Sequence, residues 1–242
     1  MMLIRRGRIA YVSDKPEDRG RRRGYDLFTI SRGEDGTLIQ RALSVIEDPP
    51  HVVRDVVQTC DAALRPRDAF VRIQTGKDPP FSGGSAWFKF GDIEVTCEGE
   101  NTADGRFSLR YALQDGPASF CNHSIVGDAW AMADYPLARG PGDFLSRNFI
   151  LPTLNKQGAT GPTLANATHV TRFLGRERIT VPAGSFDCLH FRTSSGPPGT
   201  DFSTAKFAYD MWCTDDGLYT AVLSGYLGER RYELVELSDG TP

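Results

Sequence analysis

The sequence predicts a mainly β protein, built as an antiparallel curved sheet or as a closed or split β-barrel. Apolar and polar residues alternate over short runs, Gly, Asp and Pro separate these runs, and few segments have a helical period. About a dozen runs qualify as strands, which exceeds what an open twisted sheet normally carries. We therefore expect the sheet to curl or close.

The first 24 residues form a basic segment, which we expect to be a solvated N-terminal arm. It carries eight Lys and Arg residues against three acids, whereas the whole chain has 28 Lys+Arg and 31 Asp+Glu and a net charge of −3. The interspersed acids and the lack of aromatic residues other than Tyr11 argue against nucleic-acid binding. An acidic surface on a second copy of the chain is another partner for it, which makes a homo-oligomer one of the expectations.

The first half of the chain reads as successive hairpins. The segment His51–Cys60 fits a helix or a strand equally well, because its valines satisfy both patterns. Residues 106–113 alternate cleanly, with Phe107, Leu109 and Tyr111 on one face. The predicted strands before residue 120 are 25–30, 37–46, 69–75, 86–90, 93–97 and 106–113.

A long excursion near 127–161 interrupts the strands. It is rich in Gly, Pro and Asn, and residues 129–133 could form a short helix with Asp128 as its cap. Connections of this length are often lids or binding loops. Strands are predicted again over 168–174, 178–181, 186–193, 206–213, 218–226 and 230–237. We expect one domain over 1–242, with two loosely similar halves at 25–120 and 165–238 as one layout.

A hairpin in the C-terminal third carries a family resemblance. Residues 175–186 read Gly-Arg-Glu-Arg-Ile-Thr-Val-Pro-Ala-Gly-Ser-Phe. This resembles the G-x-E-x-(I/V)-x-V-P-A-G-(T/S)-F hairpin of uncharacterised bacterial proteins, whose curved sheets look like the lipoprotein-carrier and lipocalin-like folds. Residues 209–217, a Trp-containing strand before an Asp-Gly turn, are similar to a second segment of those proteins. The resemblance implies a concave sheet able to hold an apolar ligand.

The motifs that the sequence lacks exclude several classes of site and protein. The sequence has no P-loop, dinucleotide fingerprint, H-E-x-x-H or G-x-S-x-G elbow, so we expect no cofactor. Its five cysteines lack metal-ligand spacing, so we expect neither a metal site nor a disulfide framework. It has no apolar run long enough to span a membrane and no apolar leader before Arg5, so we expect a cytoplasmic protein.

The point where the strands give way to the excursion holds the first candidate site. His123 and Asp128 are five residues apart in the sequence, so their side chains can converge on one cavity. His is suited to moving protons near neutral pH. Trp130, Trp212 and Tyr209 would form the apolar wall of the substrate cavity. The alternative is a surface histidine, a helix-capping Asp128 and a core Trp130.

The strand 186–192 offers a second candidate. Period two places His190 and Arg192 on one face, where they would supply an acid–base group and a cation for a carboxylate. If that face meets solvent instead, Leu189 and Phe191 form the core.

The third candidate is the strand around Tyr209 and Asp210. Tyr209 can donate a proton or orient a substrate, and Asp210 shares a face with Trp212, where burial would shift its pKa. Arg72 and Lys89 are cations between apolar residues and are candidates for ligand binding, although edge or solvent-facing positions also explain them.

Two functions remain compatible with these candidate residues. The first is a cofactor-independent lyase or isomerase acting on a small apolar or aromatic carboxylate-bearing molecule. In it, His123 or His190 is the acid–base group, oriented by Asp128 or Asp210. The second is a non-catalytic carrier of a small hydrophobic molecule in the same cavity. A histidine with a carboxylate partner and an open side toward the cavity favours the enzyme.

Overall fold

The computed structural model describes residues 2–76, 82–153, 155, 158–195, 208–226 and 228–240. Within these residues fifteen strands form one sheet, antiparallel throughout except where β9 runs parallel to β10. A short helix and two 3-10 turns interrupt the strands. The strands are β1 (Met2–Ser13), β2 (Arg22–Arg32), β3 (Leu38–Ile46), β4 (Val52–Cys60), β5 (Pro66–Thr75), β6 (Ser82–Phe90), β7 (Glu94–Asn101), β8 (Gly105–Ala112), β9 (Ser119–Phe120), β10 (Gly142–Leu151), β11 (Ala165–Val181), β12 (Gly184–Ser195), β13 (Tyr209–Thr214), β14 (Ala221–Tyr226) and β15 (Arg230–Asp239).

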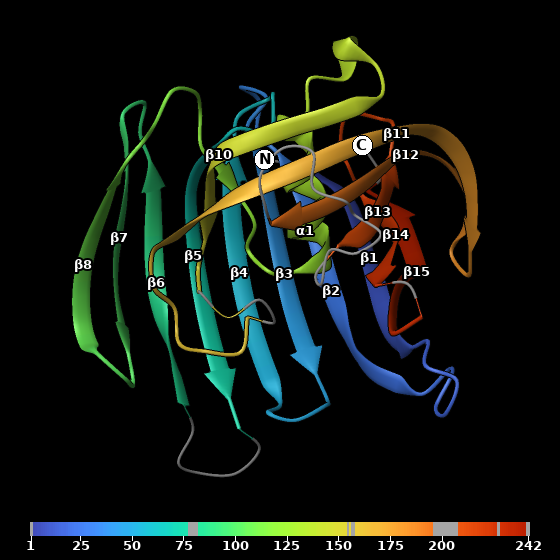
Figure 1. Cartoon of the computed structure of the whole chain (residues 1–242), viewed down its shortest axis with the longest axis horizontal. Coiled ribbons are helices and arrows are strands. Elements are labelled where there is room, and N and C mark those ends of the chain that lie inside the picture. The colour runs from blue at the N-terminus through green and yellow to red at the C-terminus, as the bar shows by residue number, and fades with distance from the viewer. Residues whose placement is uncertain are drawn as a thin grey trace.

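The first and last strands meet in the middle of the sheet. From the seam between β1 and β15, one meander runs outward from β1 to β8 and the other from β15 back to β9 (Figure 1). Most neighbours are consecutive in sequence, as hairpin connections require. The prediction of a mainly β, antiparallel curved sheet is confirmed. Among the described strands, β8 and β9 are the edges, so the sheet is curled but open.

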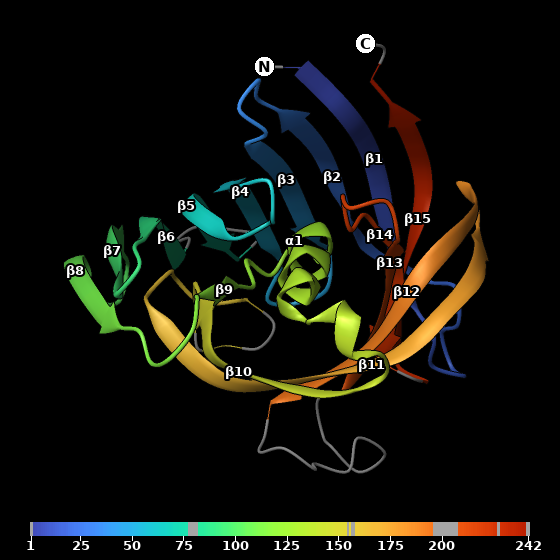
Figure 2. The same cartoon turned by 90° about the horizontal axis from the view of Figure 1, so that it is seen from above.

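The sheet curls around the helix α1 (Ile125–Ala131), which lies on its concave side (Figure 2). Alternate residues of the strands point inward and form the core with this helix. Leu189 and Phe191 are among them and are fully buried, as the second alternative for their strand predicted. Trp130 of α1 is 2% exposed, and its indole nitrogen donates to the carbonyl of Leu218 at 2.9 Å.

The expectation of a solvated arm over residues 1–24 is wrong. Met2–Ser13 forms β1, and residues 22–24 open β2. Acids that are distant in the sequence partner the arginines: Arg5 pairs with Asp216 at 2.6 Å and with Asp239 at 2.8 Å. Neutralised in this way, a basic segment can occupy the centre of a sheet.

The interpretation of 127–161 as an excursion from the sheet is only partly right. Its middle contains β10, whose Phe149 and Ile150 are buried between β9 and β11. Pro, Gly and Asn on both sides hide this strand in the sequence. The segments 168–174 and 178–181 belong to the single strand β11, and 51–60 resolves as the strand β4. Residues 206 and 207 of the predicted strand 206–213 lie outside the described residues.

Asp128 does not cap the helix. The helix begins at Ile125, and the Ser124 side chain accepts a hydrogen bond from the Gly127 amide at 3.0 Å. Asp128 therefore lies inside the helix, which frees its carboxyl for other contacts. In the described part of the chain, no helix has the length and apolarity needed to cross a bilayer.

Candidate functional site

A cavity of about 530 Å³ lies between one end of the concave sheet and the segment that leads into α1. This volume is in the range of small-molecule sites. Aliphatic residues, including Ile46 and Val52, line it beside Pro49 and Pro50. Its remaining lining consists of tyrosines, His123, Ile125, Asp128, Ala159 and a charged rim that contains Ser13, Lys15, Asp18, Arg21, Arg23, Asp48, Glu229 and Arg230.

Four neighbouring strands each place one tyrosine in this lining. Tyr11 of β1 and Tyr232 of β15 are register partners, and their ring centroids are 4.9 Å apart. Tyr209 of β13 and Tyr226 of β14 are 5.4 Å apart. Burial raises the pKa of all four phenols, so each stays neutral near pH 7. We call this set the tyrosine row.

Asp128 faces the tyrosine row from α1. Its carboxylate accepts a hydrogen bond from the Cys121 thiol, with Sγ 2.8 Å from Oδ1, and another from the Tyr209 hydroxyl. Burial raises the pKa of Asp128 to about 6, against the lowering effects of these bonds and of the charge on Arg54. The carboxyl thus gains or loses its proton just below neutral pH.

His123 is a neutral imidazole in the lining of the same cavity. Its backbone has φ of 64°, a conformation stabilised because the Asn122 side chain accepts from the Ser124 amide at 2.9 Å. Burial and the charge on Arg54 lower the pKa of His123 to about 3, although a hydrogen bond to the Thr153 backbone raises it. Within the described residues its Nε2 atom has no hydrogen-bond partner.

Arg54 is the buried cation behind the cavity. It is 1% exposed and donates to the carbonyl of His123 at 2.5 Å and to that of Gly158 at 3.0 Å. Its positive charge acts on the carboxyls of both Asp26 and Asp128. Gly158 has φ of 63°, and a Cβ there would lie 2.2 Å from an Arg54 nitrogen, so only glycine fits.

Buried polar side chains fix the segment before α1 against the sheet. The Asn122 amide donates to Gln58 at 2.7 Å and to Gln40 at 3.2 Å. Asp26 accepts from the Ile125 amide at 2.7 Å and from the Tyr11 hydroxyl. These bonds hold His123 and Asp128 in place relative to the tyrosine row.

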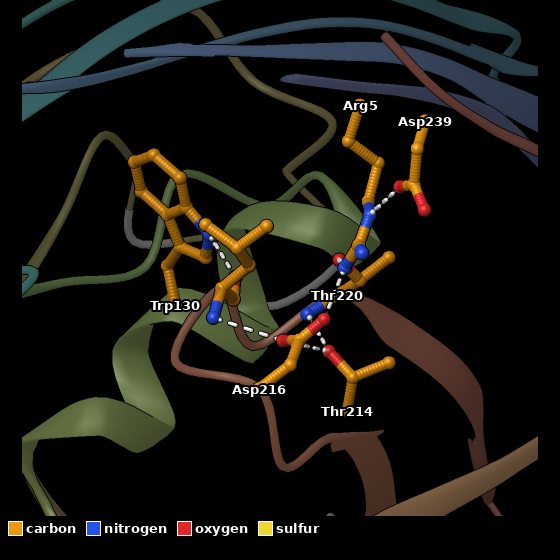
Figure 3. Close-up of polar contacts among 7 residues, drawn as sticks. Arg5, Trp130, Thr214, Asp216, Thr220 and Asp239 are labelled. Carbon is orange, nitrogen blue, oxygen red and sulfur yellow. Dashed lines mark hydrogen bonds and ion pairs between the residues drawn. The ribbon is translucent and has the colours of Figure 1, made fainter. Parts of the chain in front are cut away.

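The far end of α1 is held by the β13–β14 turn (Figure 3). The Trp130 indole bonds to the Leu218 carbonyl, and the Leu218 amide donates to Asp216 at 3.0 Å. Asp216 also accepts from Thr214 at 2.7 Å and from Arg5 at 2.6 Å. The seam strand β1 is therefore tied to the helix that carries the candidate site.

His190 and Asp210 lie together, but on the outer face of the sheet. His190 bonds to Asp210 at 2.7 Å and to Glu177 at 2.8 Å, and its ring stacks on Trp212 at 4.0 Å between centroids. Arg192 donates twice to Asp210, at 3.0 and 3.1 Å. We call these five residues the outer cluster. Both imidazole nitrogens of His190 are engaged, so neither is open to a ligand.

The structure thus brings together three of the predicted catalytic residues, His123, Asp128 and Tyr209, in one cavity. Trp130 lies in the core, and Arg72 and Lys89 are exposed on the outside of the sheet. Lys89 is 4.9 Å from the ring centroid of Trp87, which is itself 54% exposed.

Sequence reasoning did not identify Arg54, Asp26 or the other three tyrosines of the row. Tyr11 and Tyr232 are recognisable only once β1 is known to pair with β15. Among the described residues, no group of three or more His, Cys, Asp or Glu side chains could hold a metal ion.

Comparison with known proteins gives a structural similarity but no sequence match. No protein-family model matches the sequence. No curated protein matches it at a significant level. The fold is similar to a crystal structure of a beta-barrel-like protein of the domain of unknown function DUF1849 from Brucella abortus, with a TM-score of 0.55 and 11% identity over 99% of each chain. At that identity the likeness concerns the fold alone.

Proposed function

We propose that this protein binds a small molecule with an aromatic or apolar body in the cavity beside the tyrosine row. The observation that carries the proposal is the lining itself. Four neutral tyrosines and an aliphatic wall form its sides, and hydrogen-bonding groups stand at its inner end. Sites for small molecules usually combine apolar walls with a few polar groups that fix orientation.

The rim supports entry from solvent. Two of its arginines are held by acids of the rim: Arg21 bonds to Asp18 and Asp48, each at 2.7 Å, and Arg23 bonds to Asp48 at 2.5 Å. Because these charges are paired, the entrance needs no rearrangement of isolated cations when an apolar molecule passes. The β-barrel-like fold is also compatible with such a site.

An acid–base enzyme is the second candidate, favoured by the Asp128 carboxyl beside the Tyr209 hydroxyl. A carboxyl whose pKa lies near 6 can both give and accept a proton near neutral pH. His123 suits that role less well, because its pKa of about 3 keeps it from gaining a proton. His190 has carboxylate partners but no nitrogen open to a cavity. We therefore rank binding ahead of cofactor-independent lyase or isomerase chemistry.

Filling the cavity tests the proposal. Ala159 lines it and is half-buried, so Ala159→Trp places an indole where the ligand would lie. Ala112, exposed at the end of β8, supplies the matched control Ala112→Trp. Binding of small phenyl compounds, measured by saturation-transfer NMR, is expected for the parent chain and for Ala112→Trp and not for Ala159→Trp. Equal binding by all three proteins refutes the proposed site.

Turnover separates the two candidates. Any compound that binds is followed by proton NMR over hours with the parent chain and with Asp128→Asn. A bound compound that remains unchanged supports the binding protein. Conversion by the parent chain that is lost in Asp128→Asn, with binding retained, supports the enzyme.

A further inference from the structure

Two buried carboxyls share one buried guanidinium behind the cavity. The charge on Arg54 acts on Asp26 and on Asp128, and His123 adds no charge because it is neutral. Among the described groups that act on these two carboxyls, Arg54 is the one full positive charge, so this set needs one more to be neutral. A proton or a cationic ligand can supply that charge.

Asp128 is the carboxyl at which that charge is needed. Asp26 lies behind the lining and is already bonded to the Tyr11 hydroxyl and the Ile125 amide. Asp128 lines the cavity, and its hydrogen-bond donors among the described residues are a thiol and a phenol, which stabilise an anion less than a cation does. The other ionisable groups that act on it, or on which it acts, are Cys121, Tyr209, Tyr226 and Tyr232.

The tyrosine row provides the second element of a cation site. Neutral phenol rings carry negative charge on their faces and attract ammonium groups, and sets of such rings recognise amines and quaternary ammonium ions. Three of the four rings lie close enough to Asp128 for its charge to act on their hydroxyls. A carboxylate that shares a cavity with such rings combines a full negative charge with a polarisable wall.

We propose that the ligand of this cavity carries a positively charged nitrogen, a protonated amine or a quaternary ammonium, which lies against Asp128 and the tyrosine row. This inference rests on the proposed binding function and adds the charge of the ligand to it. The apolar body then extends along Ile46 and Val52 toward the rim. The raised pKa of Asp128 agrees with it, because a proton occupies this carboxyl more readily when no cation is present.

A matched series of three probes tests which ligand charge the cavity prefers. Phenethylamine, 2-phenylethanol and 3-phenylpropionate share a phenyl ring and a short chain but are cationic, neutral and anionic at pH 7.5. Their dissociation constants are measured by calorimetry with the full chain. We expect phenethylamine to bind at least about tenfold more tightly than 2-phenylethanol, which corresponds to about 1.4 kcal/mol.

Variants assign the preference to one carboxylate. Asp128→Asn is expected to abolish the preference for the amine and to leave binding of 2-phenylethanol within about twofold. Asp92→Asn makes the same change at an exposed turn and is expected to keep the preference. Tighter binding of the alcohol or the acid than of the amine overturns the inference but leaves the proposed function intact. Failure of all three probes to bind overturns both, and a preference that survives in Asp128→Asn overturns the assignment.

Discussion

Replacing Asp128 by Asn should change how stability depends on pH. The carboxyl has a pKa of about 6 in the folded protein, against 3.8 for an unperturbed carboxyl. A raised pKa means that the folded state holds this proton more tightly than the unfolded state does. Stability from this group is therefore complete below about pH 4, falls as pH rises to about 6, and stays low above that.

The size of this effect follows from the shift. Two pKa units at about 1.36 kcal/mol each give a loss of about 3 kcal/mol between pH 4 and pH 7. Asn cannot ionise, but its oxygen still accepts from Cys121 and Tyr209. The free energy of unfolding of Asp128→Asn, relative to the parent chain, should thus rise by about 3 kcal/mol over that range.

Urea unfolding followed by circular dichroism at pH 4, 5, 6 and 7 measures this difference. Asp210→Asn is the matched control of opposite sign. Burial raises the pKa of Asp210, but its bonds from His190 and Arg192 outweigh burial and lower it. Its stabilisation is lost only as pH falls below about 4, so the difference between Asp210→Asn and the parent chain should stay nearly constant from pH 5 to pH 7. A constant offset between Asp128→Asn and the parent chain at all four values would refute the reasoning.

Two further substitutions test how the site is supported. Arg54→Met should cost about 3–5 kcal/mol, because it leaves two carboxyls and two backbone carbonyls without their buried cation, whereas Arg41→Met on the exposed side of β3 should stay within about 0.5 kcal/mol. Trp130→Ala should cost about 3–5 kcal/mol through the lost core side chain, and Trp87→Ala, at an exposed position, should again stay within about 0.5 kcal/mol. Urea midpoints at pH 7 check both pairs, and a similar cost for the exposed and the buried member of a pair would contradict them.

The local parts of the fold were predictable from the sequence. Alternation and turn residues identified most strands, because one face of each meets the core and the other meets solvent. The strand β1 was missed because its arginines look solvated until Asp216 and Asp239, more than two hundred residues away, are brought beside Arg5. The strand β10 was hidden by its Pro and Gly neighbours.

The candidate site shows the same limit. His123, Asp128 and Tyr209 stand out because a short segment or strand places each of them near a loop. The rest of the tyrosine row depends on lateral pairing: Tyr11 and Tyr232 meet only because the first and last strands close the seam. In the sequence, Arg54 is one more polar residue in a Val-rich segment. Its buried position depends on hydrogen bonds to the carbonyls of His123 and Gly158, and no local pattern predicts these partners.

The central claim is that the cavity between the tyrosine row and α1 is a binding site. Its most direct test is a two-dimensional ¹⁵N NMR titration of the full chain with the tightest-binding of the three phenyl probes. We predict that the shifts concentrate on residues 121–128 and on the strand positions of Tyr11, Tyr209, Tyr226 and Tyr232. Shifts centred on the outer cluster, or spread evenly over the surface, would contradict the claim.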